Sequence, residues 1–588
     1  GGYDLWTWEA GTNWVQKSSG TLTYTDPQFV YYYHHSYVFQ NSSVLYIAAD
    51  GGIHKSYDGG SNFITLNKNY KTAQFFSIAE HANGNVIGGT QGNGTLLFDS
   101  LGNTPQTAKL LLGNYETAGS SYYFGTDGGY CSYSLLNPEV VIASGAKHKF
   151  ARSIDNGITF TSPGDILGSK LYNSTYSYGS YLTPACLWES FNDTYSPDTA
   201  MFAYMGTTVM PTSISVTSNA CRDLTFDVPY TESDSLRYGD TLYFQDKLTS
   251  KMFMGLKDYA FMTRGVHNFL NGPSWWKIAK FTGTSTAIAV SRDGDNCFIG
   301  TSNGKLIRVS KLRLATDSLK GDIDKPLTCL IDTMQINNFG NRAITSIFID
   351  IHDGNKMLVT LGNYGSTNYI YYTTNALDTI NPVAFTSKQG NLPANPVYCS
   401  LIEMDNSNMV LVGTDLGLYA TTDITASSPV WTDESGTVGH VPVFALNQMN
   451  NAINSPTEIK YKGYNYDIYN LGSIIMATQG RGAFRSNSFV GINQPHANNS
   501  SANSDMLLVF PNPAKDNASV SITLKKSSDV ILTVYDLQGK RVAGETFNNR
   551  QVGNHKLAIN VGGLQSGNYL VVMNAEGTTR SGKLMIVK

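Results

Sequence analysis

The stretch that decides the fold is MVLVGTDLGLYATT, residues 409–422. A short apolar strand ends at a small residue, a polar turn containing Gly417 follows, and a second strand begins directly after the turn. This pattern is typical of a β-hairpin. Similar stretches lie at 44–56, 85–98, 139–153, 252–263, 297–310 and 473–486, with weaker copies near Met201 and Met357. Successive copies are roughly 40–65 residues apart, a period in the range of propeller blades.

A single sheet of this kind cannot bury both of its faces, so the copies are expected to stack around an axis. We therefore predict an all-β chain whose residues 1–490 form a large β-propeller of seven to ten blades, with eight or nine favoured by the number of copies. The 56 Gly, the 36 Tyr and the charged fraction of 15% favour short strands closed by turns. The N-terminal stretch either supplies outer strands that close the ring, or sequence before it is missing.

The net charge and the lengths of the apolar runs exclude some classes of partner. The formal net charge is -4 with no basic block, so no nucleic-acid binding is expected. No apolar run approaches the ~18–20 residues of a transmembrane segment. The chain begins at Gly1 rather than Met, which we expect from processing, trimming or a partial record, with any signal peptide already removed.

The cysteines are spaced without a C-x-x-C pair, so neither a zinc site nor a redox motif is expected. Cys186 and Cys221 either close a loop in an oxidising compartment or, like the others, remain buried free thiols. The six cysteines are Cys131, Cys186, Cys221, Cys297, Cys329 and Cys399.

The C-terminal part changes in character. Residues 491–505 are polar and rich in Asn and Ser, which predicts a flexible linker. Residues 506–588 contain short alternating strands separated by turn residues. They predict a small immunoglobulin-like β-sandwich.

Two hairpins carry the sharper motif S-x-D-x-G-x-x-F. The Asp carboxylate can accept hydrogen bonds from its own turn, the Gly supplies a positive φ, and the aromatic ring fills the gap between blades. The motif resembles the Asp-box (BNR repeat) of sialidase-type and sortilin-like propellers. That resemblance implies a structural role in the turn between the third and fourth strands. The residues are Ser56, Asp58, Gly60 and Phe63, and Ser153, Asp155, Gly157 and Phe160.

The tail resembles the type A C-terminal sorting domain of the type IX secretion system of Bacteroidetes-type bacteria. The resemblance implies passage through the periplasm, recognition of 506–588 by the translocon and its shuttle protein, and release or attachment at the outer cell surface. The tail is usually cleaved in that family, so this chain is either a precursor-like species or one that keeps its tail. The matching residues are Pro511, Asn512, Pro513, Tyr535, Asp536, Gly539, Lys540, Gly567, Tyr569, Lys583 and Lys588.

The same resemblance implies O-glycosylation of Ser or Thr in Asp-[Ser/Thr]-apolar triplets. The candidate acceptors are Ser100, Thr199, Ser318 and Thr379. A triplet is a short pattern, so we expect several of these positions to be unmodified.

The sequence lacks a recognisable catalytic constellation. Asp50, Asp127 and Asp415 are candidates for the two carboxylates of a glycoside hydrolase, but each lies beside Gly in a blade turn and is predicted to bond its own backbone. His34 and His35 lack the Asp that precedes the histidines in related propellers. The loop 291–296 lacks the spacing of an EF-hand. We predict no catalytic, cofactor-binding or metal-binding residue, and no cofactor.

Two aromatic groups are candidates for stacking on sugar rings or, equally, for the core between blades: Tyr31 to Tyr33, and Trp275 with Trp276. We expect a secreted or cell-surface protein that is non-catalytic and binds a glycan or protein, or that forms an extracellular assembly, including a homo-oligomer. The alternative is a propeller-type glycoside hydrolase acting on an extracellular polysaccharide.

Overall fold

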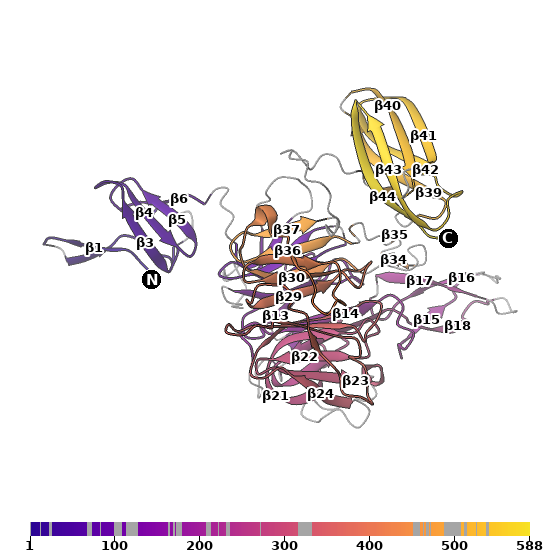
Figure 1. Cartoon of the computed structure of the whole chain (residues 1–588), viewed down its shortest axis with the longest axis horizontal. Coiled ribbons are helices and arrows are strands. Elements are labelled where there is room, and N and C mark those ends of the chain that lie inside the picture. Colours follow the sequence, from indigo (N-terminus) through magenta and orange to yellow (C-terminus); the bar gives the residue numbers. More distant parts are fainter. Residues whose placement is uncertain are drawn as a thin grey trace. The chain divides into compact units, whose positions relative to one another are not determined.

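The computed structural model consists of two compact units, Gly1–Ile492 and Asn493–Lys588, and nearly all of its regular structure is strand (Figure 1). The structure describes residues 2–11, 13–22, 26–67, 73–82, 84–98, 109–112, 127–162, 165–167, 171, 179–206, 213–221, 223–230, 236–270, 272–315, 332–450, 459–461, 464–465, 470, 472–486, 507, 509–510, 514–524, 526–536 and 540–588.

Within the described residues of the first unit, seven antiparallel sheets form the blades of a propeller, numbered here in chain order. Blade 1 consists of β7 (Phe75–Glu80), β8 (Val86–Thr90), β9 (Gly94–Phe98) and β10 (Lys109–Leu112). Blade 2 consists of β11 (Gly128–Tyr133), β12 (Val141–Gly145) and β13 (Phe150–Ser153). Blade 3 consists of β14 (Ala185–Ser190), β19 (Thr249–Gly255), β20 (Lys257–Thr263) and the first half of β21 (Trp276–Val290).

The second half of β21 is the inner strand of blade 4, so this long strand belongs to two blades. Blade 4 continues with β22 (Cys297–Thr301), β23 (Lys305–Ser310) and β24 (Asp332–Asn338). Blade 5 consists of β25 (Ile344–Ile349), β26 (Met357–Leu361), β27 (Ile370–Thr373) and β28 (Thr386–Ser387). Blade 6 consists of β29 (Val397–Ile402), β30 (Val410–Thr414), β31 (Gly417–Thr421) and β32 (Thr432–Asp433). Blade 7 consists of β33 (Val443–Gln448), β36 (Ile474–Thr478) and β37 (Ala483–Ser486).

The second strand of every blade is buried along its whole length, because sheets cover both of its faces. This explains why these strands appear in the sequence as continuous apolar runs. The close approach of the neighbouring sheet also explains the small residue in these second strands. A Cβ added at Gly89 would lie 2.0 Å from the carbonyl oxygen of Gly129 in the next blade, and one at Gly413 would lie 2.6 Å from that of Val443. Only a small residue fits at this position, because the backbone of the next blade's inner strand lies so close.

The ring closes between blade 7 and blade 1. Gln74 and Gln479 form an antiparallel bridge, and Phe75 packs in one cluster with Ile475 and Ala477. The Arg485 guanidinium lies 2.9 Å from the buried Glu80 carboxylate. Closure thus uses blades 1 and 7 themselves and not the N-terminal stretch, contrary to one of the two sequence-based alternatives. Seven blades is the low end of the predicted range.

Two of the nine hairpin copies in the sequence account for the difference. The copy at 44–56 lies in a separate N-terminal sheet of β3 (His34–Phe39), β4 (Leu45–Ala49), β5 (Gly52–Ser56) and β6 (Ile64–Thr65). Before it lies the hairpin of β1 (Trp6–Glu9) and β2 (Asn13–Gln16). The copy near Met201 lies in a ribbon of β15 (Thr199–Ala203) and β18 (Thr241–Gln245).

That ribbon belongs to an insertion between β14 and β19. The insertion also contains β16 (Ser213–Thr217) and β17 (Leu224–Pro229). They form one sheet with β34 (Ile459–Tyr461) and β35 (Tyr464–Asn465) from a second insertion in blade 7, in which β17 pairs with β34 (Figure 1). The described residues of the first unit also contain the 3-10 turns η1 (Leu312–Leu314) and η3 (Gly436–Val438), and residues 165–167 and 171 are helical.

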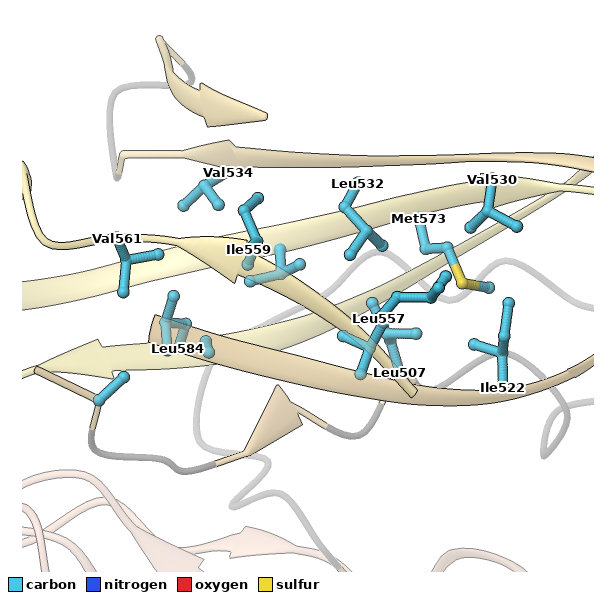
Figure 2. Close-up of a cluster of buried hydrophobic side chains, with 14 of the residues drawn as sticks. Leu507, Ile522, Val530, Leu532, Val534, Leu557, Ile559, Val561, Met573 and Leu584 are labelled. Atoms are coloured by element: carbon cyan, nitrogen blue, oxygen red, sulfur yellow. The ribbon is translucent and has the colours of Figure 1, made fainter. Parts of the chain in front are cut away.

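The second unit is a β-sandwich. One sheet has β38 (Val509–Phe510), β39 (Asn517–Leu524) and β42 (Gly553–Asn560); the other has β41 (Arg541–Arg550), β40 (Ser528–Tyr535), β43 (Gly567–Ala575) and β44 (Thr578–Ile586). Alternate side chains of both sheets meet in one apolar core, shown in Figure 2 with Leu532, Leu557 and Met573 among its members. This matches the predicted sandwich.

Candidate functional site

Six of the seven inner strands of the ring have a β-bulge near their first residue, the exception being β14 of blade 3. Register shifts occur between Phe75 and Ser77, Val397 and Cys399, and Val443 and Ala445, with equivalents in blades 2, 4 and 5. A bulge leaves one extra residue unpaired and redirects its side chain. The residues so placed in blades 1, 6 and 7 are Phe76, Tyr398 and Phe444. Three aromatic side chains from three consecutive blades therefore gather at one end of the ring.

These three rings form a contiguous cluster. Tyr398 stacks on Phe444 with centroids 4.4 Å apart and planes inclined by 15°. Phe76 meets Phe444 edge to face at 6.5 Å. All three side chains are partly exposed. We call this set, together with Tyr364 and Asp415, the aromatic end of the ring.

Asp415 organises the polar part of the aromatic end. Its carboxylate accepts hydrogen bonds from the Tyr364 hydroxyl at 2.5 Å and from the Tyr398 hydroxyl at 2.9 Å. The bond to Asp415 raises the pKa of Tyr364, and burial, followed by the same carboxylate, raises that of Tyr398. Both phenols therefore stay protonated near neutral pH. Tyr364 is 68% exposed, so it presents a ring face to solvent.

The other two predicted carboxylates are hydrogen-bonded as well. Asp127 accepts from the Gly92 N–H at 2.7 Å and from the Tyr181 hydroxyl. Asp50 lies 2.5 Å from the His35 imidazole. Asp50, Asp127 and Asp415 are each bonded to a group outside their own turn, so the interactions found are not the predicted bonds to their own backbone. The geometry does not assign any two of them to the acid and base of a hydrolase.

The other aromatic and histidine residues considered in the sequence analysis lie partly in the core and partly at the surface. Trp275 and Trp276 are 6% and 2% exposed, which removes them from any ligand-stacking role. Tyr31 donates its hydroxyl to the Gly92 carbonyl, and Tyr33 is 45% exposed. His34 is buried against the Tyr37 hydroxyl.

In the loop 291–296, the Ser291 hydroxyl donates to Asp293, which also accepts from the Asp295 N–H. In the described part of the chain, no three His, Cys, Asp or Glu side chains gather in a way that could hold a metal ion. Nor does that part contain a helix with the length and apolarity to cross a membrane.

The cysteines of the described residues are free thiols. Cys186 and Cys221 belong to different apolar clusters, so the structure does not contain the disulfide considered between them. Burial raises the pKa of Cys186 to about 12 and that of Cys221 to about 11. Cys329 lies outside the described residues.

The two S-x-D-x-G-x-x-F loops share one hydrogen-bond pattern. In each, the Ser hydroxyl donates to the Asp carboxylate, at 2.8 Å for Ser56–Asp58 and 2.6 Å for Ser153–Asp155. The same hydroxyl accepts the N–H of the motif Gly, Gly60 or Gly157, both at positive φ. Hydrogen bonds, mainly from Asn62, lower the pKa of Asp58 to about 2.

The motif aromatic of each loop turns inward. Phe63 is buried beside Leu45 and Ile47, and Phe160 packs against Ala143 and Ala151. Both loops thus anchor a turn to the apolar side of their own sheet.

Two further loops have part of this geometry without the sequence motif. In blade 5, the Thr373 hydroxyl donates to Asn375 at 2.8 Å, and in blade 6 Asp423 accepts the Thr425 N–H at 2.9 Å. Thr373 and Thr421 end their third strands, as Ser56 and Ser153 do. Sequence reasoning missed them because Thr replaces Ser and the loops are longer.

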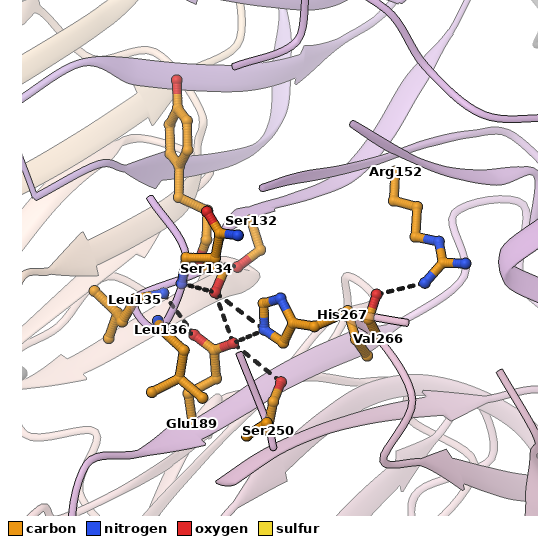
Figure 3. Close-up of polar contacts among 12 residues, drawn as sticks. Ser132, Ser134, Leu135, Leu136, Arg152, Glu189, Ser250, Val266 and His267 are labelled. Carbon is orange, nitrogen blue, oxygen red and sulfur yellow. Dashed lines mark hydrogen bonds and ion pairs between the residues drawn. The ribbon is translucent and has the colours of Figure 1, made fainter. Parts of the chain in front are cut away.

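A buried polar network joins blades 2 and 3 (Figure 3). The Glu189 side chain is 2% exposed and accepts from the Ser134 hydroxyl at 2.8 Å, the Leu135 N–H at 2.5 Å and the Ser250 hydroxyl at 3.0 Å, with His267 at 2.8 Å. Burial opposes the charge, but hydrogen bonds from His267 and the others hold the pKa of Glu189 below its ordinary value.

The network contains Ser, His and Glu without being a catalytic triad. One nitrogen, Nε2 of His267, faces both Glu189 and Ser134, whereas a triad needs the two ring nitrogens on opposite partners. The residues are also buried. The geometry indicates a staple between blades.

The described sorting-domain landmarks lie in turns and strands of the sandwich, with Tyr535 at the end of β40 and Tyr569 in β43. Asp536 accepts the Lys540 N–H at 2.9 Å, closing the turn after β40, and Tyr569 donates its hydroxyl to the Gln565 carbonyl at 2.9 Å. Gly567 begins β43, and the Lys588 N–H donates to Ser566. Pro511, Asn512, Pro513 and Gly539 lie outside the described residues, as do Ser100 and Ser318. Lys583 lies in β44, and Thr199 and Thr379 are exposed.

Comparison with known families identifies the second unit. Residues 508–588 match the secretion system C-terminal sorting domain. The chain is therefore exported to the cell surface or the medium by the type IX route, and this domain engages the secretion machinery. No curated protein matches the chain in sequence.

Solved structures similar to the chain include Sqt1 of Saccharomyces cerevisiae, with 12% identity over 71% of this chain and 96% of that one and a TM-score of 0.35. YCF48 of Cyanidioschyzon merolae has 10% identity over 66% and 94%, with a TM-score of 0.32. PorZ, a surface component of the type IX system of Porphyromonas gingivalis, has 11% identity over 100% and 90%, with a TM-score of 0.29. At these TM-scores the similarity adds nothing to the strand topology described above.

Proposed function

We propose that this chain is a non-catalytic, type IX-exported surface protein that binds a glycan or protein partner through the aromatic end of its ring. The observation that supports the proposal most directly is the Tyr398–Phe444–Phe76 cluster beside the exposed Tyr364. Aromatic faces next to fixed hydrogen-bonding groups suit sugar rings and the side chains of partner proteins. Asp415 holds both tyrosines in place, which reduces the entropy lost on binding.

Glycan-array binding by the full chain tests the proposal, with release of reducing ends measured in parallel. We expect binding without hydrolysis, and a loss of roughly two- to tenfold in affinity for Tyr364→Ala from the missing stacking contact. Tyr238→Ala is the matched control, because Tyr238 is 70% exposed outside the ring blades. Equal binding by the two variants would contradict the assignment of the site. Hydrolysis lost on Asp415→Asn would favour the glycoside hydrolase alternative.

We further propose that the S-x-D-x-G-x-x-F loops are structural Asp-boxes of BNR type, with no part in ligand binding. Their carboxylates are satisfied by their own turns, which supports this role. Thr199 and Thr379 are the described candidates for O-glycosylation, since both are exposed. Intact-mass measurement of the exported protein, compared with Thr199→Ala and Thr379→Ala variants, tests that assignment.

A further inference from the structure

The N-terminal sheet β3–β6 has the features of a ring blade. It has four antiparallel strands in sequential order and a bulge between His34 and Ser36 of its first strand. The loop after its third strand has the same Ser–Asp hydrogen bonds as the loop of blade 2. Because blades 5 and 6 have a bulge at the same point of their inner strands, each residue of the N-terminal sheet can be matched to a residue of these blades.

One row of side chains crosses this sheet on a single face. Strand pairing places Val38 opposite Tyr46, Tyr46 opposite Lys55, and Lys55 opposite Ile64. We call these four residues the open row. Counted from the bulge, the equivalent row of blade 6 is Leu401, Leu411 and Ala420, and that of blade 5 is Phe348, Leu358 and Tyr372.

In the ring, the following blade covers this row. Leu401, Leu411 and Ala420 of blade 6 share one cluster with Ile474 of blade 7. Leu358 and Tyr372 of blade 5 likewise share a cluster with residues of blade 6. The row is therefore part of the interface that the fold repeats between neighbouring blades.

In the N-terminal sheet the same row is uncovered. Val38 is 57% exposed and Ile64 is 50% exposed, whereas Leu401 and Leu411 are 0% and 7% exposed. The inner strand β3 is exposed from its second residue to its last, unlike any inner strand of the ring. Ala48 occupies the position of Gly413, where the ring admits the next inner strand, so the small residue needed for a neighbouring blade is present.

We propose that the open row is an inter-blade surface and that its partner is another four-stranded propeller blade, one that lies outside residues 1–588. The row carries a single charge, Lys55, whose ammonium lies over the rings of Tyr46 and Tyr57. A second copy docked across a two-fold axis would set Lys55 against Lys55, which is repulsive. A blade that carries a hydrogen-bond acceptor opposite Lys55 would cover the apolar side chains of the row and also provide a partner for the ammonium group.

Site-specific photo-crosslinking tests this inference in the protein exported by its producing cells. The crosslinker p-benzoylphenylalanine replaces Val38 in one variant and Ile158 in the control, since Ile158 is 72% exposed on a blade loop. We expect the Val38 variant alone to capture a peptide with the strand, Gly turn, strand pattern from outside residues 1–588. Three results would overturn the proposal: no capture above the Ile158 control, capture of residues 34–65 from a second copy, or capture of lipopolysaccharide.

A thermal measurement on residues 1–588 supplies the second readout. Val38→Lys is expected to leave the melting temperature nearly unchanged, because Val38 is 57% exposed and none of the described residues covers it. Leu401→Lys, at the equivalent buried position, is expected to lower it strongly or prevent folding. If Val38→Lys were as damaging as Leu401→Lys, the row would already be covered within this chain and the proposal would fail.

Discussion

At the scale of single residues, two buried histidines contribute to the acid sensitivity of the chain. Burial lowers the pKa of His54 and of His148 to about 4. His54 lies in β5 and His148 in the turn between β12 and β13, and both side chains are at most 2% exposed. They are therefore neutral in the folded protein, and each must gain a proton in acid at the expense of the folded state.

The sign of the effect follows from linkage. An unfolded His takes up its proton near pH 6.5, whereas these two hold it only near pH 4, so the unfolded state binds more protons between those values. The free energy of unfolding should fall from pH 6.5 to 4, by on the order of 3 kcal/mol for each group.

His148→Asn should flatten this dependence, since Asn tolerates the positive φ at position 148. Chemical denaturation at several pH values measures the slope. Ile158→Asn, at a side chain that is 72% exposed on a blade loop, should leave the slope unchanged. An identical slope for His148→Asn and the parent protein would contradict the assignment.

At the scale of elements, polar staples and apolar clusters join neighbouring blades. Glu189→Ala would leave the N–H of Leu135 and the Ser134 hydroxyl without their buried acceptor, and would remove the partner of His267. We expect a loss of roughly 3–5 kcal/mol in the stability of the first unit. Differential scanning calorimetry of the parent and of Glu189→Gln, which keeps part of the acceptor set, provides the comparison. A melting temperature unchanged in Glu189→Ala would refute the staple.

The sorting sandwich should respond independently of the ring. Leu532 is fully buried in its core, so Leu532→Ala should cost roughly 2–5 kcal/mol and reduce export. The exposed Ile531→Ala in the same strand is the control. Immunoblots of surface and periplasmic fractions measure export. Normal export of a Leu532→Ala variant that has lost its folded sandwich would show that recognition does not need the fold.

The hairpins and the sorting domain could be predicted from the sequence because the patterns that mark them lie within short stretches of the chain. A second strand buried on both faces leaves a continuous apolar run, and its small residue marks the approach of the next blade. The aromatic end was missed because Tyr398 and Phe444 lie at bulges in different blades, and no pattern along the chain marks which residue a bulge redirects. The contact between Glu189 and His267 spans 78 positions and depends on ring closure. The sequence could not show that the copy at 44–56 lies outside the ring, because this copy carries the same hairpin as the blades of the ring.

At the scale of the whole molecule, the account depends on closure of the ring between blades 1 and 7. Only a closed ring brings Phe76 of blade 1 to Phe444 of blade 7, so the proposed binding surface exists only if the two blades are neighbours. The measurement that tests this most directly is an engineered disulfide between Gln74→Cys and Gln479→Cys, the antiparallel bridge partners. Their Cα separation in such a bridge suits a disulfide.

The account predicts that mild oxidation of the double variant links the two positions, seen as a crosslinked peptide pair by mass spectrometry, and raises the melting temperature reversibly with reductant. Gln74→Cys with Gly365→Cys, a surface turn of blade 5, is the control pair and should remain unlinked. Failure of the 74–479 pair to link, or equal linking of the control pair, would contradict ring closure and the binding surface built on it.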